Sequence, residues 1–277
     1  MFRPAFTTFA QQYLSVLLRD FGTVYLNEPI PRNRNLRIYK HPSRFNWGTE
    51  YLSAITTSND RVMVSPEVIG EAELVDVLFE PNTEKPRASL GLLGELISVP
   101  CIIEIRRWAP HEWEFKTCLR HWLAWKAEAD RSIIPVDENS IDIDTDGDQS
   151  DSLEDVVDKT LLIIVPSIAP KNLQGFGARP SAINIPGVYE LAPLFCTTIV
   201  VTSELTQSAS TLWLRILGRG ITQRTAIMEL NTLDSNHPHC AVVRQQLQQW
   251  YLLLSQSRMF KESIRLMETL AMIDGLN

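Results

Sequence analysis

The hydrophobic pattern of the chain begins with a helical period. Phe6, Phe9, Tyr13, Val16 and Leu17 recur at intervals of three or four residues, with polar residues such as glutamine between them. This spacing predicts an amphipathic helix. The polar interruptions make a signal peptide a poor interpretation of the same residues.

Short apolar runs follow, and they predict strands. Residues 22–30 form one such run, residues 61–82 predict two strands that meet at Gly70 and Glu71, and residues 101–107 predict another. Residues 160–167 are continuously apolar, as in a strand buried on both faces, and residues 196–205 resemble them. A helical pattern occupies residues 110–131, and a short helix or turn is expected at 88–98. From about residue 210 the pattern is helical throughout.

This order predicts an α/β protein whose mixed sheet carries helices on its faces. We expect residues 1–207 to form the α/β core and residues 208–277 to form a helical C-terminal extension. A chain of 277 residues with 44% hydrophobic residues has ample material for such a core.

No apolar run approaches the roughly 18 residues that a membrane span requires, so we expect no membrane association. The four cysteines lack metal-binding or redox spacing, which favours reduced thiols in a cytoplasmic protein.

Charge changes this picture at one segment. The net charge is −7, but ten of the 33 acidic residues lie in residues 137–158. The rest of the chain therefore carries 23 acidic residues against 26 Lys and Arg, a net charge of +3, so a polyanionic partner is compatible with it. Asp142, Asp144, Asp146 and Gly147 fit the start of an EF-hand calcium loop, but Leu153 stands where the loop needs a glutamate. We therefore expect residues 137–158 to be a disordered, solvated insertion.

Basic residues interleave with aromatic residues in residues 31–60. Such a mixture can bind nucleic acid through phosphate contacts and base stacking, and it is also typical of a solvated loop. The phosphate-binding candidates are Arg32, Arg34, Arg37, Lys40 and Arg44.

Carboxylates interrupt two of the predicted strands. Asp76 lies among the apolar residues 74–79, and Glu104 lies in the apolar run that begins at Cys101. Alternate side chains of a strand share a face, so Glu104 and Arg106 point the same way. A charge in a buried strand is costly unless it is paired or binds a metal. If the two strands are neighbours, Asp76, Glu104 and Arg106 converge.

This arrangement resembles the core of the PD-(D/E)XK restriction-endonuclease-like superfamily. The resemblance rests on an Asp followed 28 residues later by Glu-x-basic, in the order helix, strand, strand with Asp, strand with Glu, helix, strand. It implies a restriction-endonuclease-like core in which Asp76 and Glu104 bind Mg²⁺ for the hydrolysis of DNA phosphodiesters, with Arg106 as the third catalytic residue. The superfamily has Lys where this chain has Arg106, and arginine cannot act as a base, although it can hold a phosphate. The alternative is a structural ion pair of Glu104 with Arg106 or Arg107.

A second resemblance covers roughly residues 60–235, outside the acidic segment. The segments "VDVLFEP", "LGLLGELISVPCIIE", "GVYEL" and "TLWLRILGRG…AIMEL" are similar to those of an uncharacterised, mainly cyanobacterial protein family, some of whose members are named flagellar assembly protein H.

Two functions follow as expectations. The first is a metal-dependent nuclease that acts on DNA. The second is a catalytically inactive protein that retains the fold and contacts a protein partner through its helical C-terminus.

Two further groups of polar residues have weaker patterns. His237, His239 and Cys240 lie close together, but no second group of ligands has matching spacing, so a polar loop is expected. Arg215, Arg219 and Arg224 are expected at solvated helix ends, where phosphate contacts are the alternative.

Overall fold

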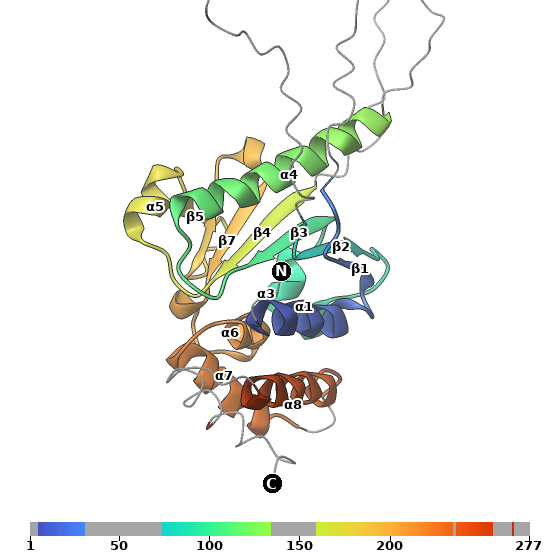
Figure 1. Cartoon of the computed structure of the whole chain (residues 1–277), viewed down its shortest axis with the longest axis vertical. Helices are drawn as coiled ribbons and strands as arrows, with labels where there is room; N and C mark the ends of the chain where they lie inside the picture. Colours follow the sequence, from blue (N-terminus) through green and yellow to red (C-terminus); the bar gives the residue numbers. More distant parts are fainter. Residues whose placement is uncertain (1–4, 31–73, 134–158, 235–236, 257–267, 269–277) are drawn as a thin grey trace, which may run out of the picture.

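The computed structural model describes residues 5–30, 74–133, 159–234, 237–256 and 268 (Figure 1). Its strands form one sheet of seven in the order β1-β2-β3-β4-β7-β6-β5. The central neighbours β3 (Cys101–Ile105), β4 (Thr160–Val165) and β7 (Thr197–Val201) are parallel. The outer pairs are antiparallel: β1 (Gly22–Leu26) with β2 (Val77–Pro81), β2 with β3, β7 with β6 (Val188–Glu190), and β6 with β5 (Arg179–Pro180). The protein is therefore a mixed α/β protein, as the pattern predicted.

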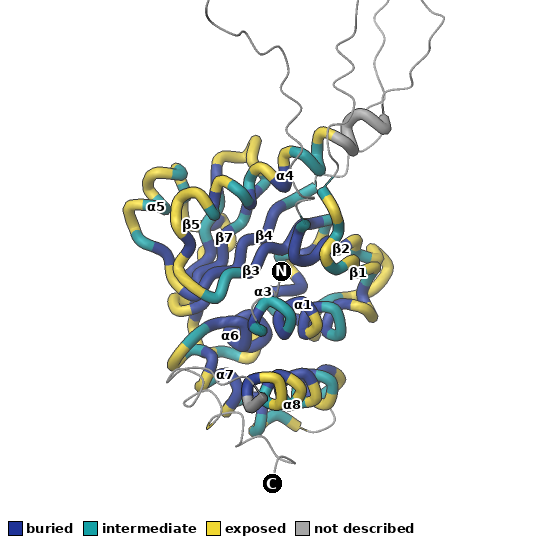
Figure 2. Tube along the Cα trace, viewed as in Figure 1, coloured by how far each residue is buried: buried dark blue, intermediate teal, exposed yellow. Residues whose placement is uncertain are grey.

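Helices cover both faces of the sheet (Figure 1). On one face, α4 (Glu112–Ile133) packs Phe115, Cys118 and Trp122 against Ile102 and Ile163 of the strands. The short helix α5 (Pro170–Gly175) lies near the start of α4, where Phe115 and Phe176 stack with ring centroids 4.4 Å apart. The burial pattern in Figure 2 agrees with this arrangement, because the central strands are buried while α4 has exposed residues along its length. β3 and β4 are buried along almost their whole length because they are covered on both sides.

The other face carries a larger group of helices. They are α1 (Ala5–Leu18), α3 (Leu92–Leu96), α6 (Leu212–Ile216), α7 (Ile221–Thr232) and α8 (Cys240–Gln256), and they share one apolar core with Val77, Ile103 and Ile164 of the sheet. Phe9 of α1 stacks on Trp250 of α8, with centroids 4.1 Å apart and planes 10° apart. The core is therefore continuous across residue 208, where the sequence predicted the helical extension to begin.

Three parts of the structure differ from the expectations. The pattern did not predict α5, β5 or β6, because elements of two to six residues in a Pro- and Gly-rich stretch leave no period to detect. His239 lies in the turn before α8, but it is buried against Trp213 and not solvated as a polar loop would be, and Cys240 begins α8. Arg215 is not at a solvated helix end either, because it is 1% exposed and forms an ion pair with Glu229.

Several expectations fall on residues outside the described part of the chain. These are the first of the two strands in residues 61–82, the acidic segment 137–158 and the basic and aromatic residues of 31–60. All four cysteines are free. Within the described ranges, no helix has the length and apolar character needed to cross a membrane.

Candidate functional site

Strand pairing brings the two predicted carboxylates together. Val77 of β2 lies opposite Ile103 of β3 in the antiparallel register, so Asp76, one residue before β2, lies opposite Glu104. Asp76 itself lies in a bend, and its carboxylate Oδ2 accepts a hydrogen bond of 3.0 Å from the Ile105 amide. The exposed fractions are 7% for Asp76 and 1% for Glu104. The predicted convergence of the two strands is thus confirmed, although Asp76 precedes the regular strand.

Arg106 bridges the two carboxylates. Its Nη1 lies 3.0 Å from Asp76 Oδ2, and its Nη2 lies 3.0 Å from Glu104 Oε2. The same guanidinium donates to the Ile105 carbonyl at 3.2 Å and to Cys118 Sγ at 3.2 Å. A planar guanidinium with several fixed donors suits such a bridge better than a lysine ammonium does. One cationic side chain therefore forms ion pairs with both acids.

Helix α4 covers this cluster on the face of the sheet opposite to α1. His121 and Cys118 lie three residues apart on the buried face of α4. His121 Nδ1 donates a hydrogen bond of 2.8 Å to Glu104 Oε1, the oxygen that Arg106 does not contact. Both oxygens of Glu104 are therefore engaged by cationic or hydrogen-bonding groups.

Helix α1 fixes the backbone of Asp76. Gln11 is 4% exposed, and its Nε2 donates to the Asp76 carbonyl at 2.9 Å and to Asn27 Oδ1 at 2.8 Å. Asn27 follows β1 with a φ of 56°, a left-handed conformation that asparagine tolerates better than most residues. The first helix thus supplies an amide that positions Asp76.

Burial and mutual repulsion separate the pKa values of the two acids. Burial, followed by the charge of Glu104, raises the pKa of Asp76 to about 6, although Arg106 and the Ile105 amide oppose the shift. Burial also disfavours ionised Glu104, but the hydrogen bond from His121 and the charge of Arg106 outweigh it and lower the pKa of Glu104. The pKa of Arg106 is raised by its anionic neighbours despite its own burial. Glu104 is therefore the ionised member of the pair, and Asp76 is the one that takes up a proton in mild acid.

The oxygens of Asp76 and Glu104 are the groups that could hold a divalent cation here, since hard cations prefer oxygen ligands. In the structure both acids instead contact the guanidinium of Arg106. In the part of the chain that is described, no group of three or more His, Cys, Asp or Glu is arranged to hold a metal ion. One internal cation therefore contacts both buried carboxylates and offsets the charge of one of them.

Other predicted residues lie away from this cluster. Arg107 extends toward the opposite face, where its Nη1 donates to the Gly218 carbonyl at 2.9 Å and to Gln223 Oε1 at 3.0 Å. The ion-pair alternative therefore applies to Arg106 and not to Arg107. The nucleic-acid candidates Arg32, Arg34, Arg37, Lys40 and Arg44 lie outside the described residues.

No sequence pattern had identified Gln11, Cys118 or His121 as parts of the site. A signal for two of them was present, because Cys118 and His121 lie on the same side of the predicted helix as its apolar residues Phe115 and Trp122. A polar residue on such a side needs a partner on the sheet beneath it.

Comparison with protein-family models, curated proteins and solved structures found no match to this chain.

Proposed function

We propose that this protein is a non-catalytic interaction protein built on a restriction-endonuclease-like scaffold. The order of α1, β1, β2, β3, α4 and β4 supports the scaffold, because it follows the order of helix, strands, helix and strand in that superfamily. Asp76, one residue before β2, and Glu104 of β3 lie opposite each other, and this pair of acids resembles the carboxylate pair of that superfamily.

One observation carries the non-catalytic part of the proposal: the Arg106 guanidinium lies 3.0 Å from both carboxylates. A metal that activates water must contact those same oxygens and keep a coordination position open. The guanidinium supplies the positive charge without supplying that position, and arginine remains protonated at neutral pH, so it does not act as a base. His121 engages the remaining oxygen of Glu104. In this proposal the cluster stabilises the scaffold, and the protein acts by binding a partner at its surface.

A metal-dependent nuclease is the second candidate, and one observation favours it. The Arg106 side chain is 22% exposed, whereas the carboxylates beneath it are 9% and 2% exposed. Rotation of this side chain toward solvent would uncover both acids for Mg²⁺ and a DNA phosphate. In this alternative Asp76 and Glu104 bind the metal and Arg106 holds the phosphate.

A nuclease assay separates the two functions. Purified wild type is incubated with plasmid and single-stranded DNA in the presence of Mg²⁺ or Mn²⁺, beside Asp76→Ala as the inactive reference and Arg106→Lys as a variant with the superfamily's usual Glu-x-Lys. The proposal predicts that wild type cleaves no more DNA than Asp76→Ala. Metal-dependent cleavage that wild type shows and Asp76→Ala lacks would overturn the proposal and establish the nuclease.

A further inference from the structure

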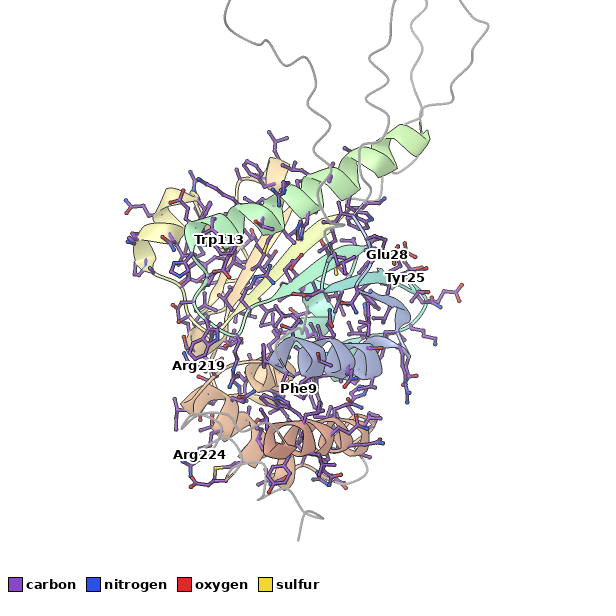
Figure 3. All side chains as sticks on the ribbon, viewed as in Figure 1. Phe9, Tyr25, Glu28, Trp113, Arg219 and Arg224 are labelled. Carbon is purple, nitrogen blue, oxygen red and sulfur yellow. The ribbon has the colours of Figure 1, made fainter. Side chains whose placement is uncertain are left out.

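The outer face of α4 carries an exposed stripe of apolar and basic side chains. Its members are Trp113, Lys116, Arg120 and Leu123, which follow one another at spacings of three, four and three residues and therefore lie on one side of the helix. Trp113 is 66% exposed and Leu123 is 50% exposed. Figure 3 shows Trp113 on the part of α4 nearest its N-terminus. We call these four residues the α4 stripe.

The apolar members of the α4 stripe are not needed for the core. The opposite side of α4 already supplies Phe115, Cys118 and Trp122, each 1% exposed, to the sheet. Tryptophan is enriched at the centres of protein interfaces because it provides a large apolar area together with a hydrogen-bond donor. An exposed Trp and an exposed Leu on one helical side therefore indicate a surface that a partner covers.

The charges of the stripe indicate the kind of partner. Lys116 and Arg120 lie between the two apolar residues, which are about 15 Å apart along the helix axis. If a second copy of α4 pairs antiparallel so that Trp113 meets Leu123, Lys116 lies against Arg120 of the other copy, and like charges oppose this register. A partner helix with apolar residues at matching intervals and carboxylates between them meets both requirements.

We propose that the α4 stripe is a docking surface for an acidic amphipathic helix of a protein partner. This inference deepens the proposed function and rests on it, because it assigns the interaction protein a surface and a class of partner. Glu112 already pairs with Lys116 within α4. That pair is fully at the surface, with side chains 66% and 65% exposed, and exposed pairs of this kind are weak enough for a partner carboxylate to compete with.

The test is peptide binding by the intact chain. The probe is a fluorescent synthetic peptide of leucine and glutamate at helical spacing, and the reference is a peptide of the same composition in scrambled order. Fluorescence anisotropy is expected to show binding of the amphipathic peptide, with an affinity that falls as salt rises. Trp113→Ala should weaken binding about thirtyfold, as the loss of a hot-spot tryptophan does, and Lys116→Glu should weaken it about tenfold or more.

Two controls make the result specific to the stripe. Lys85→Glu changes an exposed lysine in the loop after β2 and should bind as wild type does. Glu112→Gln removes the internal competitor for Lys116 and should tighten binding. Circular dichroism confirms that each variant is folded, as expected for substitutions of exposed side chains.

Three results would overturn the inference: equal binding of the scrambled peptide, equal binding by Lys116→Glu and wild type, or preference for a single-stranded oligonucleotide that Trp113→Ala abolishes. None of these variants touches the cluster of Asp76, Glu104 and Arg106. A failure of peptide binding therefore refutes the docking surface alone, whereas metal-dependent DNA cleavage refutes the proposed function itself.

Discussion

Replacing Arg106 with methionine should destabilise the protein strongly and in a pH-dependent way. The substitution removes the cation that lies 3.0 Å from Asp76 and from Glu104, and methionine fills much of the same volume. Breaking a buried ion pair by removing one partner destabilises a protein by about 3–5 kcal/mol. The lower end applies, because Asp76, with a pKa of about 6, can relieve the repulsion by taking up a proton. A loss of about 3 kcal/mol corresponds to a fall in melting temperature of roughly 6–12 °C for a protein of this size.

Urea unfolding followed by circular dichroism at pH 7 and pH 5 measures this loss. At pH 5 Asp76 is mostly protonated in the native state, so the difference between wild type and Arg106→Met should shrink. Adding Glu104→Gln to Arg106→Met should restore part of the stability at pH 7. Arg224→Met, at an exposed position of α7, is the matched control and should stay within about 0.5 kcal/mol of wild type. Arg106 does not stabilise the two carboxylates if Arg106→Met is as stable as this control, or if Arg106→Met loses the same unfolding free energy at both pH values.

Three further predictions follow from the same contacts. First, the raised pKa of Asp76 means that the native state binds more protons than the unfolded chain between about pH 4 and pH 6. The unfolding free energy of wild type should therefore rise by roughly 2 kcal/mol on acidification from pH 7 to pH 4.5, and Asp76→Asn should flatten that part of the stability profile. A profile of Asp76→Asn parallel to that of wild type would contradict this. Second, Arg107→Ala removes hydrogen bonds to Gly218 and Gln223 and the contact of the guanidinium with the Trp250 ring. Amide hydrogen exchange in α8 should therefore accelerate more than in β4. Uniform acceleration would show that Arg107 does not stabilise the packing of the C-terminal helices on the core. Third, Arg215→Met should destabilise the fold by about 2 kcal/mol in thermal unfolding. Glu229→Gln should cost less, because Arg215 is buried while Glu229 is 29% exposed. Equal losses in the two variants would contradict a buried structural role for Arg215.

Much of the central sheet could be predicted from the sequence, because its strands have strong local patterns. The alternation in residues 101–107 places Glu104 and Arg106 on one face and Arg107 on the other, and the structure has the same division. The pairing of β2 with β3 was a hypothesis, because the alternation of side chains within a strand does not indicate which strand lies next to it. The observed register of the two strands confirms the pairing.

The partners of the carboxylates could not be predicted in the same way. Gln11 reaches Asp76 across 65 residues of sequence, and no local pattern contains that contact. His121 lies 17 residues after Glu104, and its role depends on how α4 is rotated over the sheet. The burial of Arg215 was missed because an arginine three residues before a glycine is typical of a solvated helix end. Its partners Ser208 and Glu229 come from the segments before and after α6. Long-range packing decides all three positions.

The response of the melting temperature to divalent cations tests the central claim most directly, namely that Arg106 provides the positive charge for Asp76 and Glu104. A ligand that binds the native state raises its stability in proportion to the logarithm of ligand concentration over Kd. The account predicts that excess Mg²⁺ or Mn²⁺ leaves the melting temperature of wild type unchanged and raises that of Arg106→Ala, whose two carboxylates lack their cation. A metal-dependent rise in wild type that disappears in Asp76→Ala would contradict it, because the carboxylates would then bind a metal while Arg106 is present.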